Sequence, residues 1–311
     1  MIKEIAVEPE VMATWSHFRE IWDDCGVSRG RLICEYPSQW CDLVIKKARE
    51  SSSTKASSIE SKLKPGPGNP KSNKLIKTNR NYDPGKDWLN NAEKHEPPNA
   101  FDAVIARKKP RDNNRVLVAG EFDKGQSPWK TETGLEITRS TADLVKCARL
   151  LLNVSSELVL VDPNFDAYEP RFRDPFAALA QIRPDAKPWK RFELHVEHPH
   201  TKGRPDVQIL QNRVHYMKQY MPPLVPTGTK LKVFFWQGKA AGKRLHPRFI
   251  LTELGGLQPD YGLDEGQNEQ DKTIISLLSE TVWQSTWADY CETSQTFTLG
   301  KDCLVEIAGT G

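Results

Sequence analysis

Three residues able to act on a phosphate lie within one short run of this chain. His246, Arg248 and Glu253 are spaced as His-x-Arg-x4-Glu in R-L-H-P-R-F-I-L-T-E. If Arg248 to Thr252 is extended, His246 and Arg248 project from the same face, because side chains alternate along a strand. An imidazole that attacks or protonates, beside a guanidinium that holds phosphate oxygens bidentately, suits phosphoryl transfer.

The residues around this run are strongly acidic. Six carboxylates and no Lys or Arg lie between Phe249 and Asp271, and Asp264 and Glu265 are adjacent among them. A lone His–Arg pair near a strand start is also a common surface arrangement. Acids collected directly after a cationic strand favour an arranged site over a solvated face.

The elements that must position these residues alternate between strand and helix. This alternation predicts an α/β domain, with helices covering a mixed or largely parallel sheet. Asp162 and Asp166 follow the apolar strand ELVLV, at the end of a strand where α/β sheets gather chemistry. Asn164 and Asp166 could equally be turn residues. The expected strands are 101–106, 115–120, 157–161, 191–196 and 229–236, and the expected helices are 140–153, 172–182 and 205–220.

The first 98 residues differ from this pattern. Residues 1–50 carry apolar side chains at helical spacing over 9–24 and 37–49, which predicts a small N-terminal helical module. Residues 51–98 begin Ser-rich, contain Pro-Gly alternation and carry excess Lys and Arg, which predicts a basic linker or long loop. The α/β domain is then expected over 99–311.

The net charge of +3 is too small to indicate a nucleic-acid partner by itself, so a basic surface must come from local clusters. Two such clusters are candidates for holding a nucleic-acid backbone. They are Arg107, Lys108, Lys109 and Arg111 in one segment, and Lys239, Lys243 and Arg244 in the other.

Metal and cofactor chemistry is not expected. The six cysteines form no C-x-x-C pair, so reduced structural thiols are favoured. Glu197, His198 and His200 in V-E-H-P-H are a weak metal-binding pattern, and His195 is open to either a chemical role or cross-strand pairing. No apolar run is long enough to span a bilayer, and the N-terminus lacks a signal-peptide core, so a cytoplasmic protein is expected.

The motif resembles the His-x-Lys-x4-Asp signature of the phospholipase D-like superfamily, with Arg248 in place of Lys and Glu253 in place of Asp. The resemblance covers roughly residues 141–306, including ELVLVDPNFD before the motif and the L-G-G-L and Y-G-L-D-E-G segments after it. It implies a phospholipase D-like mixed β-sheet flanked by helices. It also implies that His246 is the nucleophile or acid and Arg248 the phosphate clamp.

The same resemblance implies that Glu253 is a structural carboxylate, and that Asp264 and Glu265 lie near the acidic group that orients the histidine. One motif per chain implies a homodimer, with two His246 side chains meeting across a twofold axis. The function expected is a metal-independent nuclease acting on DNA or RNA, by analogy in defence against mobile elements. The alternative is a catalytically degenerate subunit that serves as a nucleic-acid or protein binding platform in a larger assembly.

Overall fold

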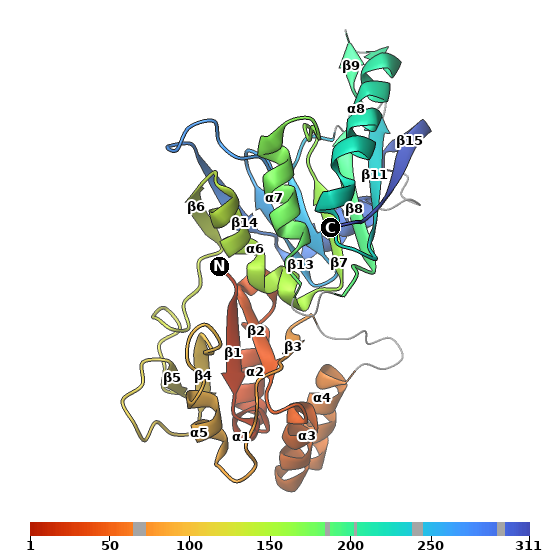
Figure 1. Ribbon diagram of the computed structural model, residues 1–311. Coiled ribbons are helices and arrows are strands. Elements are labelled where there is room, and N and C mark those ends of the chain that lie inside the picture. The colour runs from red at the N-terminus through yellow and green to blue at the C-terminus, as the bar shows by residue number, and fades with distance from the viewer. Residues whose placement is uncertain (65–72, 184–186, 202–203, 238–244, 291–295) are drawn as a thin grey trace. The chain divides into compact units, whose positions relative to one another are not determined.

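The computed structural model describes residues 1–64, 73–183, 187–201, 204–237, 245–290 and 296–311. The chain divides into two compact units, an N-terminal unit of Met1–Thr133 and a C-terminal unit of Gly134–Gly311 (Figure 1). Each unit has its own large sheet, so the protein is a mixed α/β protein as expected. In the described part of the chain, no helix is both long enough and apolar enough to cross a membrane.

The N-terminal unit is built on a parallel sheet in the order β3-β2-β1-β4-β5. The central strand β1 is apolar where it is covered, and Ile5, Ala6 and Val7 are fully buried. The strand order reverses between β1 and β4, so the connections leave the sheet in opposite directions from these two neighbours. The strands are β1 (Lys3–Val7), β2 (Arg31–Glu35), β3 (Leu75–Lys77), β4 (Ala103–Ala106) and β5 (Val116–Val118).

The helices of this unit complete its crossovers. α3 and α4 are consecutive and pack against one another, and the side chains of Trp40 and Ile59 reach the core that also contains Ile5 and Ile33. The helices are α1 (Pro9–Met12), α2 (Trp15–Asp23), α3 (Trp40–Ser51), α4 (Ser53–Leu63) and α5 (Trp88–Glu93).

These elements correct the predicted organisation of the first 133 residues. The segment expected to be a helical module contains β1 and β2, and the segment expected to be a linker contains α4, β3 and α5. The strands expected to open the second domain, β4 and β5, belong to the N-terminal sheet, so the boundary lies at Thr133 and Gly134 rather than at residue 99. Short strands of three to five residues give little periodicity from which to predict them.

The C-terminal unit has an eight-stranded mixed sheet in the order β15-β11-β8-β7-β12-β13-β14-β6. β7, β8 and β11 are parallel, and the remaining pairs are antiparallel. A separate ribbon pairs β9 (His200–Thr201) with β10 (Arg204–Pro205). The strands of the large sheet are β6 (Gly134–Thr138), β7 (Glu157–Val161), β8 (Arg191–Glu197), β11 (Lys230–Gln237), β12 (Phe249–Thr252), β13 (Gly255–Pro259), β14 (Lys272–Leu277) and β15 (Thr298–Ala308).

Helices cover both faces of this sheet. Phe176 of α7 stacks on Phe192 of β8 with ring centroids 5.4 Å apart, whereas Tyr290, directly after α9, contacts His195 on the opposite face of β8. The flanked mixed sheet is therefore as predicted. Its helices are α6 (Thr141–Val154), α7 (Pro170–Ala180), α8 (Val207–Tyr220) and α9 (Glu280–Asp289).

The carboxylate of Glu253 fixes the start of β7. Its oxygens accept hydrogen bonds from the Ser156 N–H at 2.7 Å, the Ser156 hydroxyl at 2.9 Å and the Glu157 N–H at 3.1 Å. Glu253 directly follows β12, which pairs with β7, so one side chain satisfies donors at the beginning of the neighbouring strand. This carboxylate holds the two central strands of the unit in register.

We expect Glu253→Ala to destabilise the protein by about 1–3 kcal/mol, because it leaves partly buried donors unsatisfied. Glu306→Ala is the matched control, since Glu306 forms an exposed ion pair with Lys230 and its loss should change stability little. Chemical denaturation of both variants measures the free energy of unfolding. Equal, small effects would show that Glu253 does not anchor the strand.

Candidate functional site

His246 and Arg248 lie at the carboxyl end of β7. They precede β12, which begins at Phe249 rather than at Arg248 as predicted, and Phe249 pairs with Val161, the last residue of β7. The short segment is therefore beside Asp162. His246 is exposed and Arg248 is partly buried. The imidazole of His246 is thus open to solvent, two residues before a guanidinium that the fold partly encloses.

Asp162 is the buried anion of this edge of the sheet, with 1% of its surface exposed. Burial raises the pKa of its carboxyl, while N–H groups of Leu263 and Asn164, which donate at 2.9 and 3.0 Å, and the positive charge of Arg248 oppose that rise. The Nε of Arg248 is buried and has no hydrogen-bond partner among the described residues. Arg248 therefore has an uncommitted donor next to a carboxylate.

The loop after β13 closes over this edge. Asp264, 8% exposed at its side chain, forms ion pairs with Arg139 at 2.8 Å and Arg171 at 3.2 Å. Gly262 has a φ of +124°, and a Cβ there would lie 3.0 Å from a carboxylate oxygen of both Asp162 and Asp264. Only glycine fits this approach without displacement. The loop brings two carboxylates and three arginines to the end of β7.

Glu265 forms hydrogen bonds with backbone groups at the same edge of the sheet. Its Oε1 accepts a hydrogen bond at 3.0 Å from the N–H of Thr141, the first residue of α6. Its own N–H donates to the carbonyl of Arg171 at 2.9 Å. Glu265 therefore ties α6 and the start of α7 to the loop, and its hydrogen bonds are those of a positioning residue.

The structure separates the five residues predicted to be catalytic into two groups. His246, Arg248, Asp264 and Glu265 lie at the carboxyl end of β7. Glu253 lies at the other end of β12. A strand of four residues is about 14 Å long, so Glu253 is separated from the other four residues by about that distance.

Spacing in the sequence could not identify the two arginines that form ion pairs with Asp264. Arg139 and Arg171 are each more than ninety positions from Asp264 along the chain, and their only local signal is that they precede or begin a predicted helix.

His195 belongs to the interior rather than to this site. Its ring stacks on Phe234 with centroids 4.8 Å apart, its Nδ1 accepts from the Trp236 indole N–H at 2.7 Å, and its Nε2 lies 3.1 Å from Glu193 Oε2. Because Nδ1 accepts, Nε2 carries the proton, and the ring is neutral. Burial lowers the pKa of His195, and the bond to Glu193 opposes this shift.

The V-E-H-P-H pattern does not assemble a metal site in the described residues. His198 is buried, and its Nδ1 donates to the carbonyl of Pro199 at 2.8 Å. The rings of His198 and His200 lie edge to face with centroids 5.6 Å apart. Among the residues that the structure describes, no group of three or more His, Cys, Asp or Glu side chains is placed to hold a metal ion.

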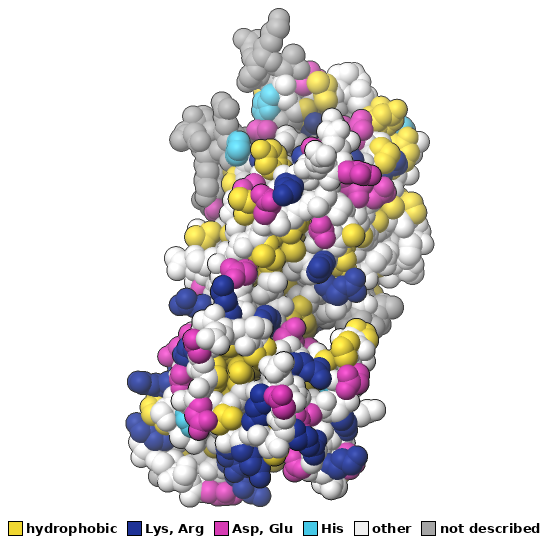
Figure 2. All heavy atoms as spheres, turned by 90° about the vertical axis from the view of Figure 1, so that its left-hand side faces the viewer, with side chains coloured by type: hydrophobic (Ala, Val, Ile, Leu, Met, Phe, Trp, Pro, Cys, Tyr) yellow, Lys and Arg dark blue, Asp and Glu magenta, His cyan; other side chains and the backbone are white. Residues whose placement is uncertain are grey.

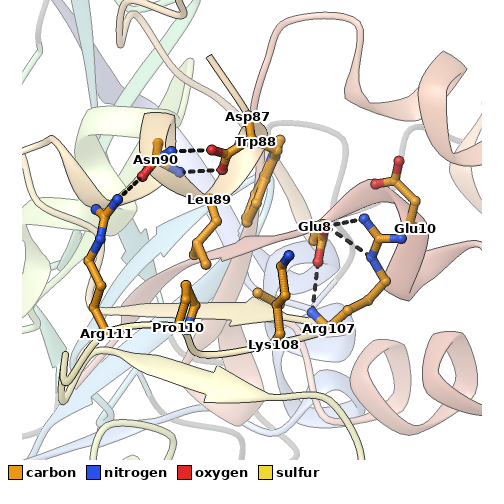
Figure 3. A pocket seen from close by; sticks show the side chains of 11 residues that line it. Glu8, Glu10, Asp87, Trp88, Leu89, Asn90, Arg107, Lys108, Pro110 and Arg111 are labelled. Carbon is orange, nitrogen blue, oxygen red and sulfur yellow. Dashed lines mark hydrogen bonds and ion pairs between the residues drawn. The ribbon is translucent and has the colours of Figure 1, made fainter.

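The first predicted basic cluster lines a pocket in the N-terminal unit. Arg107, Lys108 and Arg111 lie around it (Figure 3), whereas Lys109 is paired with Asp112 at 3.6 Å and is not part of its wall. On the face of the molecule drawn in Figure 2, Lys and Arg side chains are interspersed with Asp and Glu. The second predicted cluster, Lys239, Lys243 and Arg244, lies outside the described residues.

Comparison with known proteins adds little. No family model matches the sequence, and no curated protein matches it. Among solved structures, the chain is similar to the archaeal chromatin protein TrmBL2, whose structure is described as showing a novel mode of DNA binding. The match has 11% identity, covers 54% of this chain and 55% of that chain, and has a TM-score of 0.24, which supports no inference about this chain.

The buried neutral His195 generates a prediction about pH. A histidine whose folded pKa is lowered stays uncharged in the folded state while the unfolded state takes up a proton, so stability falls as pH drops below about 6.5. We expect the stability advantage of wild type over His195→Gln to shrink between pH 7 and pH 5. Denaturant unfolding at a series of pH values measures it.

His246→Gln is the control, because it alters an exposed histidine of the same unit and should keep the pH dependence of wild type. A constant difference between wild type and His195→Gln across this range would show that His195 does not titrate differently on folding.

Proposed function

We propose that the protein is a metal-independent phosphodiesterase that cleaves nucleic acid through His246. The observation that carries the proposal is the exposed His246 imidazole two residues from Arg248, at the carboxyl end of β7. The phospholipase D-like spacing of His246, Arg248 and Glu253 supports the same chemistry. The hydrogen bonds of Glu253 to Ser156 and Glu157 also support this chemistry, because the resemblance implies a structural role for that carboxylate.

The proposed reaction has two steps. A neutral His246 nitrogen attacks phosphorus, a P–N bond forms, and the P–O bond to the leaving nucleotide breaks. The leaving oxygen takes a proton from the imidazolium of His246 of the partner subunit. Water then attacks the phosphohistidine and gives a proton to that second imidazole, and the P–N bond breaks. Arg248, whose side chain is only partly buried, provides the positive charge that stabilises the non-bridging oxygens.

An exposed aromatic group supports a single-stranded substrate. Tyr168, in the loop that follows β7, is 53% exposed and lies 5.0 Å from the ring of Tyr216 and 6.3 Å from that of Tyr220. Arg173 lies over the Tyr220 ring at 4.6 Å. Tyrosines and arginines at a surface bind unstacked bases through their planar faces, and in single strands those faces are accessible.

A binding platform without catalysis is the second candidate. The observation that favours it is the charge of Arg248, which acts on the buried carboxylate of Asp162 and is therefore partly neutralised within the fold. The Arg-for-Lys and Glu-for-Asp replacements in the motif point in the same direction, because a tight phosphate site does not treat Arg and Lys as equivalent.

We expect cleavage of single-stranded DNA or RNA to persist in EDTA, and His246→Ala to reduce it about a thousandfold or more. Arg248→Ala should reduce it about a hundredfold. Arg248→Lys should retain most activity, because lysine is the residue that the phospholipase D-like signature has at this position. Labelled oligonucleotides of both kinds, single- and double-stranded, provide the measurement.

His215→Ala is the matched control, since His215 is an exposed histidine on α8 of the same unit. Its activity should equal that of wild type. Binding without cleavage by wild type, with binding weakened in Arg248→Ala, would favour the platform. Equal cleavage by wild type and His246→Ala would exclude the proposed nucleophile.

The two-histidine mechanism also predicts a dimer. When wild type and His246→Ala subunits are mixed in equal amounts and allowed to exchange, only wild-type pairs keep both histidines, so activity should fall to about a quarter of the wild-type value. Sedimentation analysis checks the dimer, and a fall to about one half would show that each subunit acts alone.

A further inference from the structure

The parallel sheet of the N-terminal unit has a pocket where its strand order reverses. Glu8 follows β1 and Arg107 follows β4, the two neighbours at the reversal, and both line the pocket (Figure 3). In open α/β sheets, ligands bind outside the carboxyl ends of the strands at this point, because the loops diverge and leave a crevice. The crevice here has a volume of about 480 Å³, within the range of small-molecule sites.

The pocket has charged groups committed to its own structure. Glu8, 8% exposed, accepts hydrogen bonds from the Arg107 N–H at 2.7 Å and from its guanidinium at 2.7 and 3.0 Å. Asp87 caps α5 by accepting from the Asn90 N–H at 2.9 Å. The Glu8–Arg107 pair joins the loop after β4 to the start of α1, and Asp87 fixes the start of α5.

Other charged groups are available. Lys108 and Glu10 line the pocket, and neither forms a hydrogen bond or ion pair with the described residues (Figure 3). Arg111 donates to Asn90 Oδ1 at 2.6 Å and lies 3.5 Å from Glu93, and it has further donors on its fork. An ammonium and a guanidinium on the loop after β4 suit a phosphate. The Glu10 carboxylate, whose charge also acts on Arg107, can accept hydrogen bonds from hydroxyl donors.

The remaining wall is apolar. In Figure 3, Trp88 and Leu89 lie between Arg111 on one side and Glu8, Glu10 and Arg107 on the other, and Pro110 faces them from the loop after β4. The indole N–H of Trp88 donates to the carbonyl of Tyr36 at 2.8 Å, so the ring is held in place. Trp88 is 8% exposed and Leu89 7% exposed, so a planar group would contact only the small accessible part of this wall.

From this arrangement we infer that the pocket binds a nucleoside phosphate, with its phosphate at Lys108 and Arg111, its ribose hydroxyls at Glu10 and its base against Trp88 and Leu89. The acidic groups interspersed with the basic ones disfavour a continuous nucleic-acid backbone, which needs a run of one charge. The inference is independent of the proposed reaction, since His246 belongs to the other unit.

Isothermal titration calorimetry of the full chain tests it, with AMP, ADP and ATP, and with ribose 5-phosphate and inorganic phosphate as fragments. We expect the nucleotides to bind at least about tenfold more tightly than either fragment. Lys108→Ala should weaken nucleotide binding about tenfold or more, and Glu10→Gln should weaken AMP more than inorganic phosphate.

Lys109→Ala is the matched control, because it removes a neighbouring cation that is paired with Asp112 and does not line the pocket. Lys109→Ala should bind nucleotides as wild type does. The inference is overturned if no nucleotide binds at millimolar concentration, if inorganic phosphate binds as tightly as AMP, or if Lys108→Ala and Lys109→Ala have equal effects. Binding of an oligonucleotide but of no mononucleotide would also overturn it.

Discussion

The buried carboxylate of Asp162 is the constraint on which the C-terminal site depends. A carboxylate removed from water must be hydrogen-bonded or paired, and here backbone N–H groups of Leu263 and Asn164 and the charge of Arg248 meet that need. Each of these groups comes from a different segment. Satisfying one anion therefore fixes the end of β7, the approach to β12 and the loop after β13 in one arrangement, with His246 left at the surface.

The sheets of the two units have one feature in common, which is the position of their polar side chains. In each, polar side chains gather where strands end, since backbone groups there are no longer paired within the sheet and loops are free to vary. The N-terminal pocket is built from a Glu8–Arg107 pair and leaves Lys108 unpaired among the described residues. The C-terminal cluster leaves one guanidinium nitrogen of Arg248 without a partner among those residues.

Prediction from sequence succeeded for a continuous apolar run, β7, and for a helix with a long apolar periodicity, α6. β7 was predicted with its observed bounds, and α6 with an N-cap at Ser140, whose hydroxyl accepts from Asp143 N–H. In the first 98 residues, the helices predicted over 9–24 and 37–49 are present as α1, α2 and α3, but the strands and α4 were missed. A Ser-rich segment such as Ser53–Leu63 resembles a linker until it packs on a neighbouring helix. The basic segment 107–111 was predicted as one surface, and the structure divides it between a pocket wall and Lys109.

The sequence by itself determined that the protein is α/β, that His246 and Arg248 are two positions apart, and that helices flank the strands around them. These are local properties, set by side-chain periodicity and spacing. Only the tertiary structure decided that Asp162 lies beside Arg248, that Arg139 and Arg171 hold Asp264, and that β1 and β4 are neighbours with a pocket at their ends. The reason is that strand order and loop closure join residues far apart in the chain, and their pairing follows from burial and charge, which spacing does not encode.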